Sequence, residues 1–507
     1  MNSHAFRTIV IGMMAALSLL VSACDELNTG LVKRGYSFLV NFHLRWTHPE
    51  NLGADMVDFN ESGISGAADP RVAMDGHGNA VIVWRQKPDG ETYHIYKSEF
   101  RNNAWINPAD KDDHLNYSGD LYGDVKKPAV AMSNDGTAIV SWLQEYRDEV
   151  MMPFEQSAWV YQYGNGIWNF LSPNPRVSYN LSEHLSVDMN DLGVAEVITT
   201  MYYSATIYQV WVSEITNGIN NYNKPLSSGA TDSTNPDVAV NNSGSVLVAW
   251  EQGSRIYMNM KTGSVWSGDE TGTPIGLTGA EVYTAIKPKV AISDNGTAVI
   301  VWTQQFNTVG FPTHVYRSYY NGTSWSHPAA MIDSVDPMNP GDPHLYWADS
   351  ADVAMDGSGN AIMVWRMQRP DGEVHLQMSQ CSNGVWSVIP YSEVASHFDP
   401  DGGVANEPDV AMDSSSNAVI VWDQYDGAAY NHIYKSEYRN GRWTHPASLD
   451  DNIDSESPAE RSGFTPQVAT NPGGETIIVW DQFLDMSNRH IYKSECRPYR
   501  EILPLLY

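Results

Sequence analysis

The sequence is poor in cysteine and in basic side chains, and it has no long hydrophobic run beyond its first residues. Three cysteines among 507 residues exclude a disulfide-dense scaffold. The 30 Lys and Arg residues face 60 Asp and Glu residues, which gives a formal net charge of −30. Such a field repels nucleic acid and anionic headgroups, so nucleic-acid binding is excluded and cationic partners are favoured. A Ser/His/Asp arrangement, an HExxH motif and a phosphate-binding loop are also missing from the sequence.

The first residues are typical of an export signal. Arg7 gives a positively charged start, and the apolar run from Thr8 to Leu20 is too short to cross a membrane. The segment LVSAC, ending at Cys24, resembles the bacterial lipobox, in which the cysteine is lipidated and becomes the first mature residue. We therefore expect a signal peptide at residues 1–23 and a lipidated tether at residues 24–35. The alternative is an ordinary signal peptide in which Cys24 is incidental.

Lipidation at Cys24 predicts a location in the bacterial cell envelope. Two or more acyl chains hold a protein stably on a membrane. We therefore expect the lipid to be the only membrane contact, with palmitate as one of the acyl groups. Asp25 resembles the signal that retains lipoproteins in the inner membrane of enteric bacteria. The outer membrane, the periplasm and the cell surface remain open alternatives.

The rest of the chain repeats itself about every 51 to 63 residues. The eight copies begin at similar positions, which are Val72, Val130, Val187, Val238, Val290, Val353, Val410 and Val468. A tryptophan follows 12 residues later in every copy except the third, which has Thr199. A turn rich in Asp, Asn, Ser and Gly separates two β-branched runs, and this pattern predicts a hairpin. A third run such as HIYKS and a fourth run around another tryptophan complete each copy.

Four antiparallel strands per repeat predict an all-β fold, a single β-propeller of eight four-stranded blades over residues 36–507. The repeat resembles that of a bacterial exported and lipoprotein family, in which it reads P-x-V-A-M-D-x-x-G-N-A-x-V-V-W. This resemblance covers residues 45–495 and implies a propeller, distantly sialidase-like in architecture, but no particular activity.

Ring closure is predicted from residues 45–49. Their sequence, RWTHP, is the same as that of residues 442–446, although it stands before the first repeat. We expect this N-terminal segment to supply the outer strand of the eighth blade and so to remove an exposed edge. Residues 500–504 are the rival candidate for that strand.

Several repeated polar positions are interpreted as structural. Cys381 and Cys496 stand where other copies have an aromatic residue, so we expect them to fill packing positions and to form no disulfide. Histidines recur at the start of the third run and in the W-[ST]-H-P segments. We expect them to make structural hydrogen bonds, for example to a neighbouring blade. The hairpin residues Asp75, Asp356 and Asp413 fit Asx turns better than calcium ligands.

A binding surface is predicted on one face of the propeller. Turns between the first and second strands have constant length, whereas the loops that leave the opposite face vary strongly. Acidic and aromatic residues gather in these loops. The candidate binding-face residues are Asp110, Asp112, Asp113, Tyr122, His344, Tyr346, Trp347, Phe398, Asp450 and Asp451. Solvated loops that only keep the protein soluble are the alternative interpretation, and calcium at residues 110–113 stays open.

These observations lead to three hypotheses of function. The first is a monomeric, membrane-anchored lipoprotein whose propeller binds an envelope protein or glycan through its acidic loop face, with no catalytic residue, metal or cofactor. The second is a divergent glycan-acting hydrolase. Residues 133–137 and 293–297 are weakly similar to the sialidase Asp-box, although their spacing differs. The third is a scaffold in envelope assembly, by analogy with a propeller lipoprotein of the outer-membrane barrel-assembly machine.

Overall fold

The computed structural model describes the chain almost entirely as β-strands. The described residues are 38–59, 66–88, 92–118, 122–146, 155–171, 184–204, 207–268, 271–277, 282–307, 312–336, 347–368, 372–387, 398–454, 461–485 and 488–504. Within these ranges the one helical element is a short 3-10 helix, η2 (Met331–Asp333), and no helix is long and apolar enough to cross a membrane. The predicted all-β class is confirmed.

The chain divides into two compact units. The smaller unit comprises residues 1–45 and 497–507, and the larger comprises residues 46–496. In the smaller unit, the first part of β1 (Phe38–Thr47) is a hydrogen-bonded neighbour of the last part of β33 (Arg489–Pro504). The remaining residues of both strands belong to the larger unit.

Each sequence repeat forms an antiparallel meander whose strands follow chain order. Repeat 1 has β2 (Ala68–Met74), β3 (Ala80–Gln86), β4 (His94–Arg101) and β5 (Ala104–Ile106). Repeat 2 has β6 (Tyr122–Met132), β7 (Ala138–Tyr146), β8 (Glu155–Gly164) and β9 (Ile167–Phe170). Repeat 3 has β10 (Leu185–Met189), β11 (Val194–Ser204), β12 (Ile207–Thr216) and β13 (Ile219–Pro225). Repeat 4 has β14 (Ser233–Val240), β15 (Val246–Gln252), β16 (Arg255–Thr262) and β17 (Val265–Trp266), and β18 (Thr273–Pro274) also pairs with β16.

The later repeats have the same order. Repeat 5 has β19 (Val282–Ile292), β20 (Ala298–Phe306), β21 (Thr313–Tyr320) and β22 (Trp325–Ser326). Repeat 6 has β23 (Ala348–Met355), β24 (Ala361–Gln368), β25 (Val374–Ser382) and β26 (Val385–Trp386). Repeat 7 has β27 (Val404–Met412), β28 (Ala418–Tyr425), β29 (Asn431–Arg439) and β30 (Arg442–Thr444), and one parallel pair joins β25 to β27. Repeat 8 has β31 (Gly463–Thr470), β32 (Thr476–Phe483), β33 and, outermost, β1.

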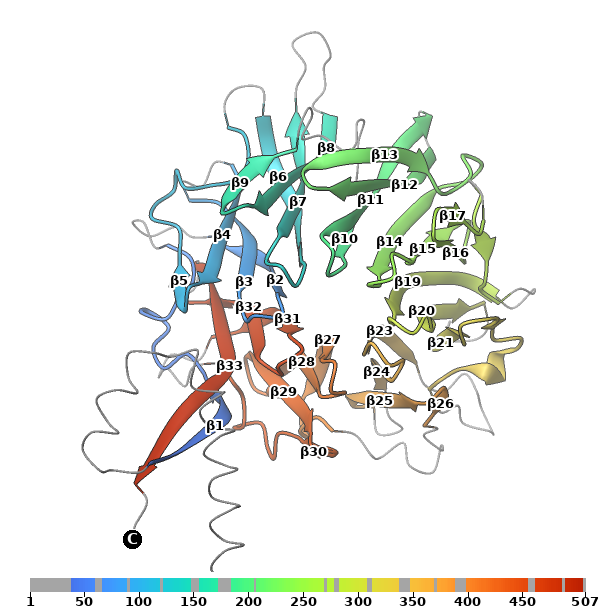
Figure 1. Ribbon diagram of the computed structural model, residues 1–507. Coiled ribbons are helices and arrows are strands. Elements are labelled where there is room, and N and C mark those ends of the chain that lie inside the picture. The colour runs from blue at the N-terminus through green and yellow to red at the C-terminus, as the bar shows by residue number, and fades with distance from the viewer. Residues whose placement is uncertain are drawn as a thin grey trace, which may run out of the picture. The chain divides into compact units, whose positions relative to one another are not determined.

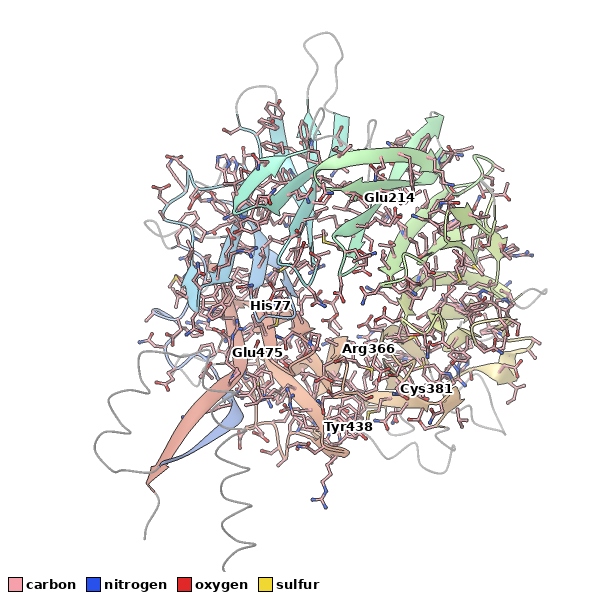
Figure 2. All side chains as sticks on the ribbon, viewed as in Figure 1. His77, Glu214, Arg366, Cys381, Tyr438 and Glu475 are labelled. Atoms are coloured by element: carbon pink, nitrogen blue, oxygen red, sulfur yellow. The ribbon has the colours of Figure 1, made fainter. Side chains whose placement is uncertain are left out.

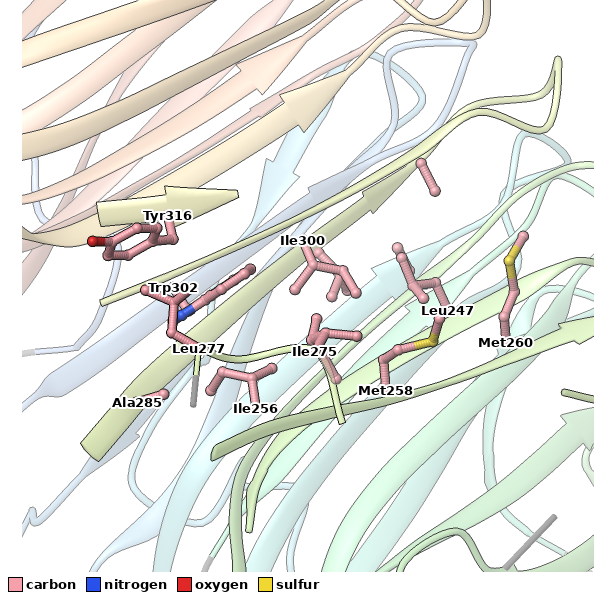
Figure 3. Close-up of a cluster of buried hydrophobic side chains, with 14 of the residues drawn as sticks. Leu247, Ile256, Met258, Met260, Ile275, Leu277, Ala285, Ile300, Trp302 and Tyr316 are labelled. Atoms are coloured by element: carbon pink, nitrogen blue, oxygen red, sulfur yellow. The ribbon is translucent and has the colours of Figure 1, made fainter. Parts of the chain in front are cut away.

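The second strand of each repeat is buried on both faces. Trp84, Trp302 and Trp480 lie at its centre and are fully buried. Their neighbours are Val, Ile and Ala, because short β-branched runs without polar alternation suit a strand covered on both sides. Figure 3 shows one result, a cluster in which Ile300 and Trp302 of repeat 5 pack with Leu247, Ile256 and Met258 of repeat 4. Apolar contact between successive sheets therefore forms the core.

Contacts between successive sheets run through the whole larger unit. The first strand of each repeat contacts the first strand of the next, and β31 of repeat 8 contacts β2 of repeat 1. Figure 1 shows these two strands, in red and blue, side by side. The structure is thus a propeller-like stack of four-stranded antiparallel sheets.

Carboxylates on the first strands tie neighbouring sheets together. Asp237, Asp352 and Asp409 stand immediately before the repeated valine. Each accepts a hydrogen bond from the backbone N–H of the valine in the next sheet, at 3.0, 3.0 and 2.7 Å. Lys289 occupies the same position in repeat 5, and the carboxylate of Asp237 raises the pKa of its amine. This inner row of charges has a structural role between the sheets.

The predicted roles of the repeated polar residues are confirmed in two cases. Oδ1 of Asp75 accepts the backbone N–H groups of His77 and Asn79, which is an Asx turn. Cys381 and Cys496 are free and buried, and each lies opposite the first residue of the second strand, as Phe100 does in repeat 1.

The recurring histidines are also structural. Their hydrogen-bond partner is an aspartate in a loop, and not the neighbouring blade that was given as an example of an expected partner. Nδ1 of His432 lies 3.1 Å from Asp454, which follows the fourth strand of the same repeat rather than a neighbouring sheet. Oδ1 of Asp454 also accepts the N–H of Ile433 at 3.1 Å. The pair therefore fixes the loop that leaves this sheet, and His314 with Asp336 repeats it in repeat 5.

Residues 46–58 make the equivalent contacts for the eighth repeat, with partners in repeats 7 and 8. Trp46 donates to Glu437 at 2.9 Å, His48 Nδ1 lies 2.8 Å from the Ser494 hydroxyl, and Asp58 lies 2.9 Å from His490 Nδ1. The hydroxyl of Tyr492 donates to the carbonyl of Leu52, as the equivalent tyrosine of repeat 7 does to its own loop. Residues 500–504 continue β33 and do not form a separate strand.

Candidate functional site

One position of the repeat carries most of the unusual chemistry. It immediately follows the tryptophan of the second strand and precedes a glutamine in six repeats, whereas repeat 6 has Met367 there. The tryptophan and the glutamine bond each other in repeats 1, 7 and 8, with Nε1 to Oε1 distances of 2.9 Å. The residue between them varies from repeat to repeat. It lies at the end of the sheet where the chain enters the first strand from the preceding loop, and we call this end of the sheet the loop end. The occupants with charge are Arg85, Glu251, Arg366, Asp423 and Asp481.

Asp481 is the most enclosed of these residues. Its side chain is 0% exposed, and its carboxylate lies 2.9 Å from Nη1 of Arg489. The hydroxyl of Thr465 also donates to it. Burial raises the pKa of Asp481 to about 6 although Arg489 acts in the opposite direction. Asp69 and Arg85 of repeat 1 act on the same carboxyl, so repeats 8 and 1 meet here.

Asp423 is the equivalent residue of repeat 7 and is 4% exposed. Nδ2 of Asn431 donates to its Oδ2 at 3.1 Å. Burial raises the pKa of Asp423 to about 7, and the carboxylates of Glu407 and Asp481 add to that rise. Two neighbouring sheets therefore present buried carboxyl groups whose pKa values are raised by desolvation.

Arginines flank the two carboxyl groups. Arg366, labelled in Figure 2, binds Asp349 through two hydrogen bonds of 2.9 and 3.1 Å, and its third nitrogen donates to Asn406 at 2.8 Å. Its guanidinium lies 5.0 Å from the ring centre of Trp347. The guanidinium of Arg489 lies 4.9 Å from the ring centre of Phe464. Arginines stacked on aromatic rings keep fixed positions and present donors to polar ligands.

Arg85 completes the group on repeat 1. Its Nε lies 2.7 Å from Asp69, and its guanidinium lies over the ring of Tyr93. We name the loop-end cluster as the set Asp69, Arg85, Arg366, Asp423, Asp481 and Arg489. Its members are separated by up to about 400 positions in the chain, and they meet because repeats 6, 7, 8 and 1 are neighbours.

Backbone strain accompanies this end of the first strands. Asp69, Glu407 and Thr465 have positive φ values of 55°, 38° and 50°. Each precedes a proline and lies where the pairing with the second strand shifts register. Non-glycine residues in this region cost free energy, and such positions are enriched at functional sites.

The predicted binding-face residues have more scattered roles. Asp110, Asp112 and Asp113 are exposed, but Asp110 and Asp113 accept backbone N–H groups of their own turn, and Asp112 pairs with Lys111 at 3.0 Å. Asp451 closes the equivalent turn of repeat 7, and Asp450 is exposed beside it.

The aromatic candidates also differ among themselves. Tyr122 packs against Tyr117 and Trp159. Phe398 is 7% exposed and packs against Trp422, so its ring belongs to the core. Trp347 is the candidate that contacts the loop-end cluster, whereas His344 and Tyr346 lie outside the described residues.

The sequence interpretation missed the loop-end cluster. The sequence does show that the residue after the repeated tryptophan varies from copy to copy. A list of these variable residues does not say, however, which of them approach one another in the fold. Only the order of the sheets in space brings Asp423 and Asp481 beside the arginines.

Comparisons with known proteins add no family. No family model matches the sequence, and no curated protein matches it. A protein of unknown function from Dyadobacter fermentans DSM 18053 is similar in structure, with 12% identity, a TM-score of 0.39, and coverage of 90% of this chain and 99% of that chain. The polysaccharide lyase PL25 ulvan lyase has 9% identity, a TM-score of 0.38, and coverage of 84% and 93%. The Hadza microbial sialidase Hz136 has 11% identity, a TM-score of 0.35, and coverage of 92% and 90%. Similarity at this level carries over no activity.

Proposed function

We propose that this protein is a glycan-acting hydrolase whose active site is the loop-end cluster. One observation carries the proposal. Two buried carboxyl groups at equivalent positions of adjacent sheets, Asp423 and Asp481, have pKa values raised to about 7 and about 6, and Arg489 pairs with Asp481. Hydrolysis of a glycosidic bond uses two carboxyl groups, one protonated and one ionised. The two groups differ in protonation because their surroundings give them different pKa values.

The environments assign the roles. Asp423 has the higher pKa and no cation in hydrogen-bond contact among the described residues, so it is the proton donor to the leaving oxygen. Asp481 is held ionised more readily by Arg489, so it is the general base or the nucleophile. Arg366 and Arg489, supported by Trp347 and Phe464, bind hydroxyl or carboxylate groups of the sugar.

The test is cleavage of a panel of plant, algal and bacterial polysaccharides, followed as released reducing ends. Asp423→Asn and Asp481→Asn each keep side-chain volume and should lower the rate by roughly 100-fold or more. Glu145→Gln removes a carboxylate at the loop end of repeat 2, paired there with Lys126, and should leave the rate unchanged. A panel that the wild-type protein leaves intact, or full activity in both aspartate variants, would overturn the proposal.

The architecture that we propose for this enzyme is a closed propeller of eight blades, completed by the N-terminal segment. The contacts of the first strands support it, since they continue from repeat 8 to repeat 1. Glu99 and Glu495 support it as well. Each binds the tryptophan indole of the next sheet, Trp168 and Trp105, at 2.7 and 2.8 Å. Glu437 of repeat 7 binds Trp46 in the same way, as if residues 46–58 belonged to blade eight.

We also propose that the protein is an envelope lipoprotein. Residues 1–23 would be removed as a signal peptide, Cys24 would carry the lipid, and residues 24–35 would form the tether to a propeller that begins at residue 36. The LVSAC segment and the short apolar run before it support this proposal. The enzyme would then act on glycans at the cell surface or in the periplasm as a monomer.

A second candidate is a binding protein that uses its acidic loops without catalysis. The exposed carboxylates of Asp112 and Asp450 support it, since among the described residues neither accepts a backbone N–H in its turn. Its partner would be an envelope protein or glycan. Neutralising residues 110–113 and 450–451 should abolish capture of that partner, whereas unchanged capture counts against this candidate.

A further inference from the structure

His375 differs from the other recurring histidines in what its second nitrogen faces. The residue lies just inside β25, where the strand begins, and is 0% exposed. Its Nδ1 lies 2.8 Å from Oδ2 of Asp399, and Oδ1 of Asp399 accepts the N–H of Leu376 at 2.9 Å. An ionised carboxylate only accepts hydrogen bonds, so Nδ1 carries the proton. When the ring is neutral, Nε2 then presents a lone pair that can bind a metal ion.

Two carboxylates converge on that lone pair. Oε2 of Glu373 lies 3.1 Å from Nε2 of His375. One carboxylate oxygen of Glu373, one of Asp401 and a ring nitrogen of His375 all lie within 4.8 Å of one another. An imidazole nitrogen and two carboxylate oxygens at these distances offer three ligand atoms to one cation.

Repeats 5, 7 and 8 share the histidine and its aspartate, but among their described residues the two additional carboxylates do not converge on it. Nε2 of His432 has Asp426 at 4.0 Å. Nε2 of His490 is buried without a hydrogen-bond partner among the described residues. Among the residues that the structure describes, the group around His375 is the one in which three possible ligands meet. The histidine and its aspartate are thus part of the scaffold, and Glu373 and Asp401 are additions specific to repeats 6 and 7.

The donor set is chemically suited to a divalent transition-metal ion. An imidazole nitrogen with two carboxylate oxygens fits Zn²⁺, Mn²⁺ or Co²⁺ better than Ca²⁺, which takes six to eight oxygen ligands. A histidine ligand that donates its other N–H to a carboxylate is the usual outer-shell arrangement, because that bond fixes the tautomer and the ring orientation. Asp399 fills this role for His375.

We propose that Glu373, His375 and Asp401 bind a zinc-class divalent metal ion, and that Asp399 is their positioning residue. Three protein ligands leave a fourth position for water or for a ligand atom, as in open zinc sites. The ion joins the segment before β25 to the segment before β27, next to the parallel pair between Val374 and Val404. It therefore fixes two loops on the variable face that the repeat pattern singles out for binding. The site does not depend on the proposed glycan hydrolysis.

The experiment measures metal binding by the full chain after chelator treatment. Zn²⁺ titration followed by calorimetry should give one ion per chain, and Co²⁺ should give the visible absorption bands of a low-coordinate site. Glu373→Gln and Asp401→Asn change side chains at the surface, so they should leave folding intact and weaken binding at least tenfold. Asp399→Asn should weaken it by roughly 10- to 100-fold.

The matched control is Asp426→Asn, which changes the carboxylate beside His432 in repeat 7 and should leave Zn²⁺ binding unchanged. The proposal is overturned if the wild-type chain binds none of Zn²⁺, Co²⁺ and Mn²⁺ at micromolar concentration. It is equally overturned if Glu373→Gln binds as the wild type does, or if nitrogen NMR shows His375 doubly protonated with Zn²⁺ present.

Discussion

At the scale of single residues, the second strand separates structural from chemical positions. Trp422 and Gln424 are fixed by packing and by their mutual hydrogen bond, so little can change there. Asp423 stands between them and points to the loop end, where burial rather than a pairing cation sets its protonation. A scaffold that is repeated eight times can thus vary one residue per copy without loss of fold.

The raised pKa values predict the pH dependence of the proposed reaction. Asp423 must be protonated to act as the acid, so activity falls as pH rises through about 7. Asp481 must be ionised, so activity falls as pH decreases through about 6. We expect a narrow optimum between these values in a profile of kcat/KM against pH. A profile flat from pH 5 to 8 would contradict the assignment.

At the scale of strands and sheets, buried polar groups join neighbouring repeats. Lys261 of β16 lies 2.8 Å from Glu196 and 2.5 Å from Glu214, both in repeat 3. The hydroxyl of Tyr222 also lies 3.2 Å from Glu196. Burial opposes the charge on both partners and raises the pKa of Glu196 to about 7, whereas the carboxylate of Glu196 raises the pKa of the Lys261 amine. The sheets of repeats 3 and 4 are therefore held by a charged network as well as by apolar packing.

Removal of the lysine should be costly. Lys261→Met leaves the fully buried carboxylate of Glu196 without a cation, which lowers the free energy of unfolding by about 3–5 kcal/mol. Urea unfolding should show that Lys261→Met combined with Glu196→Gln recovers most of this loss. The control Lys126→Met breaks a more exposed pair at 3.5 Å and should change the free energy by less than about 1 kcal/mol. Equal effects of the two lysine variants would argue against the network.

The loop-fixing pair of histidine and aspartate tests whether residues 46–58 belong to repeat 8. Asp58 is 5% exposed and binds His490 and Ile491, which are more than 430 positions away. Asp58→Ala should lower the free energy of unfolding by about 1–3 kcal/mol, because a buried histidine and an N–H lose their acceptor. Asp454→Ala removes the same two contacts within repeat 7 and also the acceptor of Gln482, so it should cost at least as much. If Asp454→Ala destabilises the protein and Asp58→Ala does not, the N-terminal segment is not docked as proposed.

At the scale of the whole molecule, the proposed anchor at Cys24 would confine the protein to a membrane surface. Cys24→Ser removes the acceptor of the lipid and should move the protein from the membrane fraction to the soluble fraction. Its cleavage rate on a soluble polysaccharide should not change, because the loop-end cluster contains no residue of the tether. Unchanged fractionation of this variant would show that lipidation does not hold the protein.

The repeats made the local structure predictable. The large number of acidic residues, however, made the residues of the proposed site hard to recognise in the sequence. Eight copies of one pattern gave the strands, the Asx turn at Asp75 and the buried positions of Cys381 and Cys496, because these depend on neighbours within one repeat. The prediction that Phe398 lies on the binding surface was wrong, because its ring is buried against Trp422. That tryptophan belongs to a strand that begins 20 positions later in the chain. With 60 acidic residues in the chain, sequence position alone could not single out Asp423 and Asp481.

By itself, the sequence determined the all-β class, the hairpins and the residues that each sheet buries, because strand periodicity and turn chemistry act over short distances. Only the tertiary structure decided which charged residues meet. Contacts between repeats 6, 7, 8 and 1 place Arg366, Asp423, Asp481 and Arg489 at one end of their strands, and the low polarity of that packed environment raises the carboxyl pKa values. Desolvation and proximity are properties of the assembled sheets, so no single repeat contains them.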